Sequence, residues 1–210
     1  MIQSIYTPKT LTGIIGGSMN HTNWKITEQS RQELANGLLL AMNHYDYNQV
    51  TITLITQEAG LSRKTFYRLF HHKDEVLELL IKNKIMEFAT ELQSKEFHQY
   101  WNVVQLYFDF WEEHKDFILF LKKHHLLSKF LEYSYENSIE IFEYVRTKSV
   151  IEQFRKPLPY LLSYAVGGMH NMLLKWLEDD MAISYVKKAS RNKKFPRCFF
   201  SFILPTLQAS

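Results

Sequence analysis

The chain has 210 residues, of which 46% are hydrophobic and 15% aromatic, so a disordered chain is excluded and one large or two small cores can be filled. Only seven glycines and five prolines interrupt it, and regular two-residue alternation is nearly absent, which predicts an all-α fold. The formal net charge of +3 indicates no partner by itself, but residues 61–73 carry four Lys/Arg and no acid, whereas residues 74–180 hold eighteen acids against twelve Lys/Arg.

The single cysteine, Cys198, cannot form a disulfide within the chain, so the expected compartment is the reducing cytoplasm. No apolar run approaches the roughly 18 residues of a membrane span, and no membrane partner is expected. Residues 1–22 lack the charged-then-apolar order of a signal peptide. We therefore expect these residues to be a disordered leader, and Met19 is an alternative start of translation.

The first helix is expected over residues 27–45, with Thr27 as its N-cap. Its apolar stripe consists of Leu34, Leu38, Ala41 and Met42. A short helix follows within residues 50–60, where Thr51 is the expected N-cap and Gly60 suits a left-handed helix end. Its apolar face holds Ile52, Ile55 and Ala59, and its polar face holds Thr53, Thr56 and Gln57. The small Ala59 leaves room for the following helix to cross closely.

The next helix, expected over residues 62–70 with Ser62 as N-cap, has one face for burial and one for an anion. Phe66, Leu69 and Phe70 fall within one apolar arc of roughly 100°. The remaining arc carries Arg63, Lys64, Thr65, Tyr67 and Arg68. Two short helices joined by a three-residue turn with a glycine have the spacing of a helix-turn-helix.

A long fourth helix is expected over residues 73–93, with Asp74 and Glu75 in its first turn to complement the helix dipole. Its apolar stripe consists of Leu77, Leu80, Ile81, Ile85, Phe88 and Leu92.

The run "VTITLITQEAGLSRKTFYRLFHHKDEVL" (50–77) closely resembles the DNA-binding head of the TetR family of bacterial transcriptional regulators. The matching positions are Thr51, Ile55, Ala59, Gly60, Leu61, Ser62, Thr65, Phe66, Tyr67, Phe70, Lys73 and Leu77. The resemblance implies a three-helix head (23–73), a linking fourth helix (73–93) and a C-terminal helical domain for effector binding and dimerisation (94–210). It also implies a homodimer that binds a palindromic operator of double-stranded DNA, commonly as a repressor.

By position in that motif, the resemblance assigns DNA contacts to nine residues. Arg63, Lys64 and Thr65 approach base edges, where an arginine can pair with guanine. Tyr67, Arg68 and Lys73 hold phosphates, and Ser62 caps the reading helix beside them. Thr51 and Thr53 match positions that touch the DNA backbone or the bases. Outside such a motif, a basic helix face is usually only solvated.

From about residue 97 the chain predicts three helices of roughly 12 to 20 residues, divided near Lys115 and near Ser128. Pro157 and Pro159 then break the chain, and Pro159 suits the first turn of a helix over residues 160–180. The tail after residue 186 departs from the amphipathic last helix that is usual in the family.

In the resembled family the last two long helices pair with their twofold mates, and here these would be residues 159–178 and part of 182–207. The candidate interface residues are Gly167, Gly168, Asn171, Leu174 and Trp176. The alternative is that the two glycines accommodate an internal contact. A candidate effector pocket is lined by Tyr107, Phe108, Trp111, Phe117 and Phe120. The alternative is that these aromatic residues only fill the hydrophobic core.

The stretch "GGMHNMLLKWLEDDM" also resembles the body of one branch of the family, which includes regulators of dihydroxyacetone kinase operons. Some relatives in that branch respond to a protein partner, so the effector is either a small molecule or a protein. The alternative function is therefore a coregulator or activator whose C-terminal domain binds a protein.

Catalysis finds no support, because the sequence has no glycine-rich phosphate loop, no nucleophile elbow and no metal-ligand spacing. The adjacent pairs His71–His72 and His124–His125 point about 100° apart on a helix and cannot chelate one metal. We therefore expect no catalytic residue, no metal and no cofactor. We interpret His71 and His72 as turn residues that add charge near phosphate at lower pH.

Overall fold

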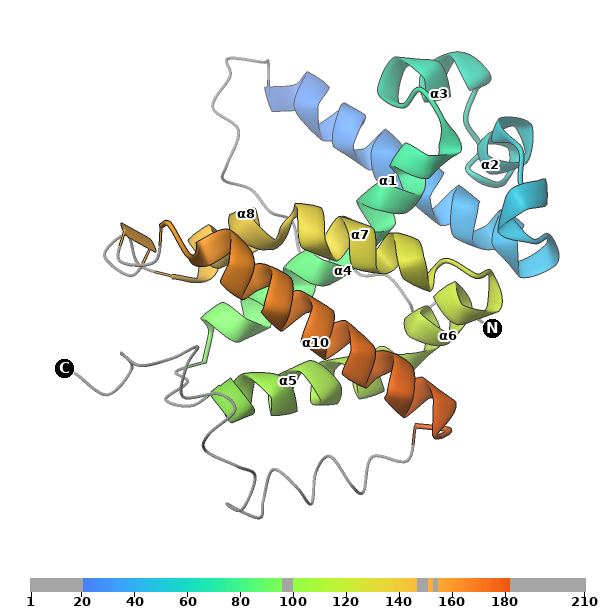
Figure 1. Ribbon diagram of the computed structural model, residues 1–210. Helices are drawn as coiled ribbons and strands as arrows, with labels where there is room; N and C mark the ends of the chain where they lie inside the picture. Colours follow the sequence, from blue (N-terminus) through green and yellow to red (C-terminus); the bar gives the residue numbers. More distant parts are fainter. Residues whose placement is uncertain (1–20, 96–99, 147–150, 153–154, 182–210) are drawn as a thin grey trace. The chain divides into compact units, whose positions relative to one another are not determined.

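The computed structural model describes residues 21–95, 100–146, 151–152 and 155–181, and these residues form helices and no strand (Figure 1). The fold is all-α, as predicted. Most of the expected leader, the tail after residue 186 and Cys198 lie outside the described residues. None of the described helices has both the length and the apolar character needed to cross a membrane. Contacts divide the chain into two compact units, with the boundary inside one helix between Lys84 and Ile85.

The N-terminal unit begins with α1 (His21–His44). This helix starts six residues before Thr27, so the prediction of Thr27 as the N-cap is wrong. No glycine or proline separates His21 from Thr27, and the helix continues through a residue that caps helices elsewhere. The predicted stripe Leu34, Leu38, Ala41 and Met42 is confirmed, since all four side chains are buried.

A short 3-10 turn, η1 (Tyr47–Gln49), leads into α2 (Ile52–Glu58) and α3 (Arg63–Leu69). Gly60 has φ of 65°, the left-handed conformation that its place at the end of α2 requires. Ile55 is buried as predicted. Thr56 was expected on the polar face, but its side chain is buried too. Its hydroxyl donates to the carbonyl oxygens of Ile52 and Thr53, both at 3.0 Å, which satisfies the buried polar group within α2.

Gly37 of α1 allows this helix to approach α2 closely. A Cβ at that position would lie 2.4 Å from the carbonyl oxygen of Ile55 and 2.9 Å from the Cβ of Ala59. Ala59 therefore leaves room for α1, where we expected it to leave room for α3. The sequence shows a glycine inside a helical pattern here, but only the tertiary contact explains it.

Helix α4 (Lys73–Gln93) has the predicted bounds. Its stripe is buried through Phe88, and only Leu92 is partly exposed. The second half of α4 belongs to the C-terminal unit, where Phe88 contacts the rings of Tyr107 and Phe110 at centroid distances of 5.7 and 5.4 Å.

The C-terminal unit also contains the helices α5 (Tyr100–Glu113), α6 (Lys115–Lys123), α7 (Leu127–Glu136), α8 (Ser138–Val145) and α10 (Leu158–Glu178). Of these, α6, α7 and α8 are shorter than the predicted length of roughly 12 to 20 residues. The break at Lys115 is confirmed, but the prediction of three helices before Pro157 is wrong. A break at Asn137 was missed, and α6 ends just before His125, which has a left-handed backbone (φ 58°).

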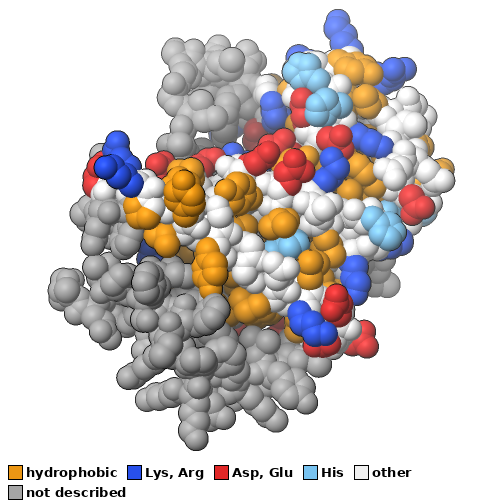
Figure 2. Space-filling model, in the orientation of Figure 1, with side chains coloured by type: hydrophobic (Ala, Val, Ile, Leu, Met, Phe, Trp, Pro, Cys, Tyr) orange, Lys and Arg blue, Asp and Glu red, His pale blue; other side chains and the backbone are white. Residues whose placement is uncertain are grey.

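Helix α10 packs against α5, α7 and α8 (Figure 1). Pro159 lies in its first turn, as predicted. Figure 2 shows hydrophobic side chains at the surface of the C-terminal unit. The large exposed ones on α7, α8 and α10 are Tyr135, Ile139, Tyr160 and Tyr164.

Candidate nucleic-acid interface

Two side-chain caps build the helix-turn-helix. The Thr51 hydroxyl oxygen accepts from the backbone N–H of Leu54 at 3.2 Å and begins α2. The Ser62 hydroxyl oxygen accepts from the backbone N–H of Thr65 at 3.0 Å and begins α3. Both caps were predicted and are confirmed. They satisfy N–H groups that have no partner inside such short helices.

The two faces of α3 separate as its sequence predicts. Phe66 is fully buried, and Leu69 and the following Phe70 are buried with it. The side chains of Arg63, Lys64, Tyr67 and Arg68 are exposed. Thr65 is partly buried, and its hydroxyl lies 2.9 Å from that of Ser62. The structure therefore brings together, on one exposed face, three fixed positive charges and a tyrosine.

Tyr67 connects the two faces. Its ring meets the buried Phe66 ring edge-on, with centroids 5.6 Å apart, while the residue keeps 51% of its surface exposed. The guanidinium carbon of Arg63 lies 6.0 Å from the centroid of the same ring, at the outer limit of a cation–π contact. These contacts favour an outward, ordered placement of both side chains.

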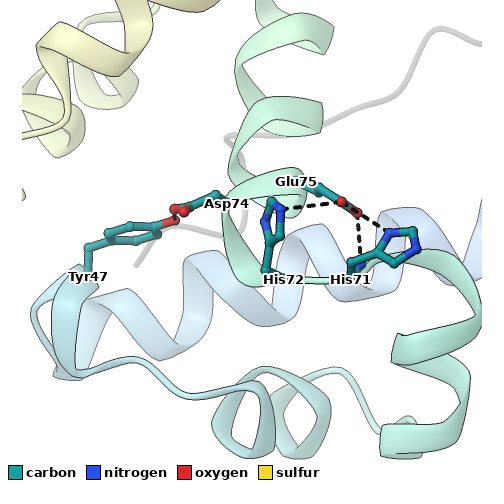
Figure 3. Close-up of polar contacts among 5 residues, drawn as sticks. All are labelled: Tyr47, His71, His72, Asp74 and Glu75. Carbon is teal, nitrogen blue, oxygen red and sulfur yellow. Dashed lines mark hydrogen bonds and ion pairs between the residues drawn. The ribbon is translucent and has the colours of Figure 1, made fainter.

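The ammonium group of Lys73, the first residue of α4, is bound inside the protein. Its Nζ donates to the carbonyl oxygens of Tyr47 at 2.6 Å, Val50 at 2.9 Å and Asn48 at 3.3 Å. It also lies 4.5 Å from the centroid of the Tyr47 ring. The Tyr47 hydroxyl donates to the next residue of α4, Asp74 (Figure 3).

Sequence reasoning missed this cluster, which joins the turn before α2 to the start of α4. The sequence gives little sign of it, because a tyrosine in a short turn does not indicate that its hydroxyl will bond to a residue 27 positions later in the chain.

Beside this cluster, Glu75 holds the turn between α3 and α4 (Figure 3). Its Oε2 accepts from the backbone N–H of His71 at 2.8 Å, and its Oε1 lies 3.2 Å from Nδ1 of His71 and 3.5 Å from Nε2 of His72. Partial burial raises the pKa of the Glu75 carboxyl, but the His71 N–H and the two imidazoles outweigh it and lower that pKa. That His71 and His72 add charge near phosphate stays a prediction.

Within the described residues, no group of three or more His, Cys, Asp or Glu side chains is placed to hold a metal ion.

Four of the five predicted pocket residues of the C-terminal unit, Tyr107, Phe108, Trp111 and Phe117, are linked by ring contacts. Tyr107, Phe108, Trp111 and Phe117 are buried, and Phe120 is partly exposed. The Trp111 ring lies nearly parallel to that of Phe117, at 16° and 6.4 Å, and meets Tyr107 edge-on at 6.1 Å. These contacts are those of a packed aromatic core, and the entry of an effector among them stays a prediction.

The predicted interface residues of α10 fall into two groups. Gly168 is exposed and Gly167 partly exposed, and at both an added Cβ would meet no atom of the described residues within 4 Å, so no contact among those residues explains these glycines. Asn171 is exposed as well, and Leu174 is partly exposed. Trp176 is different: it is only 4% exposed and packs edge-on against Phe108, with centroids 5.8 Å apart. Its assignment to an interface is corrected, because the side chain is buried in the core of its own chain.

Comparison with known families gives one match for the C-terminal part of the chain. A TetR C-terminal family, described as "Transcriptional regulator C-terminal region", matches residues 98–195. Comparisons with curated proteins and with solved structures gave no match. The match covers α5 to α10, and the N-terminal motif lies before it.

Proposed function

We propose that this chain acts as a member of the TetR family, whose C-terminal region it matches over residues 98–195, and represses transcription by binding a palindromic operator as a homodimer. The family match lies in the C-terminal region, while the proposal of operator binding rests on the N-terminal unit. The observation that carries it is the exposed face of α3, where Arg63, Lys64, Tyr67 and Arg68 stand opposite a buried apolar face.

We assign the reading of bases to the first turn of α3. Arg63 and Lys64 are exposed there, and the Thr65 hydroxyl lies 2.9 Å from that of the cap, Ser62. A recognition helix in the major groove contacts base edges with its N-terminal residues, and arginine pairs with guanine through two hydrogen bonds. Thr51 and Thr53 at the start of α2, and Tyr67 and Arg68 farther along α3, are assigned to the DNA backbone. Such phosphate contacts set the position of the protein on DNA and carry no sequence information.

The test is fluorescence-anisotropy binding to DNA that flanks the protein's own gene, compared with scrambled DNA of equal length. We expect tighter binding to the flanking DNA, which saturates at two protomers for each site. Substitution Arg63→Ala should reduce discrimination at one base pair by about 1–3 kcal/mol, because a bidentate pair is lost. The matched control is Arg31→Ala, because Arg31 lies in α1 over the Phe70 ring and outside the proposed reading face. Equal binding of both DNAs by the native protein would contradict the proposal.

We propose that the dimer forms through α10. Its support is the strip formed by the exposed Gly168 and Asn171 and the partly exposed Gly167, near which Tyr160 and Tyr164 also leave apolar surface uncovered. Glycines without Cβ atoms let two helix backbones approach closely, and apolar surface beside them gains from burial.

We further propose that an effector binds the C-terminal unit among its aromatic residues and releases the DNA. Within the described residues, the buried indole Nε1 atoms of Trp111 and Trp176 have no hydrogen-bond acceptor. A buried donor without an acceptor costs about 1–3 kcal/mol, so an effector that presents an oxygen to either indole would recover part of that cost. Tryptophan fluorescence during titration with small oxygen-bearing compounds tests this assignment, with Trp111→Phe as the variant that should lose the response.

A further inference from the structure

We propose that Lys73 is a positioning residue that closes the helix-turn-helix on itself and that its ammonium group does not contact DNA phosphate. We call the group formed by Tyr47, Lys73 and Asp74 the Lys73 clasp. This inference rests on the proposed DNA binding and changes the role expected of one residue within it.

The clasp joins the two ends of the DNA-binding motif. The three carbonyl oxygens that accept from Lys73 belong to residues directly before α2, at separations of 26, 25 and 23 positions in the chain. Lys73 itself lies four residues after the end of α3. One ammonium group therefore holds the entry to α2 and the exit from α3 together.

The bonding capacity of this ammonium group is used inside the protein. A lysine ammonium has three N–H donors, and three carbonyl oxygens lie within hydrogen-bond distance of Nζ. The residue is partly buried, and the face of the nearly buried Tyr47 ring (4% exposed) supplies a cation–π contact at 4.5 Å. To reach a phosphate, Lys73 would have to give up these contacts and leave backbone oxygens without a donor.

A second hydrogen bond also joins the turn before α2 to the start of α4. Asp74 accepts from the Tyr47 hydroxyl, so consecutive residues of α4 hold the backbone and the side chain of one turn residue. Short helices such as α2 and α3, with seven residues each, depend on such external contacts for a defined orientation. The clasp thereby sets the angle at which the exposed face of α3 meets DNA.

The salt dependence of binding separates positioning from phosphate contact. A lost phosphate contact lowers the slope of log K against log salt by about 0.9, whereas lost positioning weakens binding without that change. We expect Lys73→Met to weaken binding to DNA flanking the gene about tenfold, with an unchanged slope. Tyr47→Phe, which removes no charge, should weaken binding in the same direction. Arg68→Met is the matched control, because it removes one exposed positive charge from the same unit and should lower the slope.

A second measurement, made without DNA, tests the contacts of the Lys73 clasp separately from DNA binding. Amide hydrogen exchange across residues 50–61 should be faster in Lys73→Met and in Tyr47→Phe than in the native protein, because the clasp no longer restrains the motif. Arg68→Met should exchange like the native protein. Circular dichroism establishes whether each variant is folded. If Lys73→Met does not fold, Tyr47→Phe alone tests the clasp.

Failure of the Lys73 inference and failure of the proposed DNA binding would give different results. A slope that falls by about 0.9 in Lys73→Met, together with native binding by Tyr47→Phe, would overturn the inference and return Lys73 to a phosphate. Unchanged hydrogen exchange in both clasp variants would also overturn it. If the native protein binds no DNA but both clasp variants exchange faster, the proposed function fails while the clasp stands.

Discussion

At the scale of single residues, burial decides how several polar side chains of this protein behave. Thr56 and His170 have nearly the same exposure, at 3% and 5%, but Thr56 bonds to two carbonyl oxygens of its own helix. His170 lies on α10 with its ring 6.0 Å from that of Phe130, and no described residue bonds to its Nδ1. Burial lowers the pKa of the His170 imidazole, because the charged form loses its hydration.

His170 should therefore make the protein less stable in acid. Its pKa is lowered on folding from the ordinary value of 6.5, so below that value the unfolded chain binds more protons than the folded chain. The free energy of unfolding should fall as the pH drops below about 6.5, by about 1.4 kcal/mol for each unit of the pKa difference. Urea denaturation between pH 7.5 and 5.5 measures this, and His170→Leu should reduce the fall.

The matched control is His44→Gln, because His44 is exposed at the end of α1. It should keep the pH dependence of the native protein. An equal fall in the native protein and in His170→Leu would show that other groups govern the acid sensitivity.

At the scale of elements, the N-terminal unit depends on close packing more than on helix length. Helices α2 and α3 have seven residues each, which is too short for stability in water without caps and neighbours. Thr51 and Ser62 supply the caps, and α1 supplies the neighbour through Gly37. Helix α3 is thus held by contacts outside itself, of which the Lys73 clasp is one, and its neighbour α2 is held by the α1–α2 crossing.

Substitution Gly37→Ala should destabilise the N-terminal unit by about 1–3 kcal/mol, the usual cost of adding a methyl group to a packed contact. The physical reason is that the new Cβ would lie 2.4 Å from a backbone oxygen, which cannot move aside as a flexible side chain can. Urea denaturation followed by circular dichroism measures the change. Asn36→Ala is the control, because Asn36 is exposed on the same helix and should change stability by less than about 0.5 kcal/mol. Native stability in Gly37→Ala would contradict the tight crossing of α1 and α2.

At the scale of the whole molecule, α10 carries an exposed strip that we propose a second subunit covers. The alternative that Gly167 and Gly168 accommodate an internal contact finds no neighbour in the described chain. Tyr160, which lies in the first turn of the same helix, is 80% exposed. A large aromatic side chain left in water favours association, and the proposed reading of a palindrome requires two copies.

Gly168→Arg should therefore weaken the proposed dimer by more than about 3 kcal/mol, a hundredfold or more in dissociation constant, because a long charged side chain would enter the proposed close helix contact. Sedimentation equilibrium measures this directly, and the affinity for operator DNA should fall in parallel. Gly168→Ala is the control and should remain dimeric. A dimer that persists in Gly168→Arg would place the subunit interface on another face.

Much of this architecture could be predicted from the sequence because its signals are local. The bounds of α4 and the caps Thr51 and Ser62 follow from residues within one or two helical turns of each other. The two faces of α3 follow from the helical period alone. Gly60 is likewise explained by a conformation that a single residue must adopt at a helix end.

The tertiary structure decided the features that depend on residues far apart in the chain. Lys73 meets carbonyl oxygens 23 to 26 positions away, Gly37 meets α2, and Trp176 meets Phe108. None of these partners is indicated by periodicity or capping, because such patterns report which face is buried and not what buries it. The sequence by itself determined an all-α chain with a basic, capped helix-turn-helix. The packing determined that the charges of α3 are exposed, whereas the ammonium group of Lys73 is bonded to backbone oxygens within the motif.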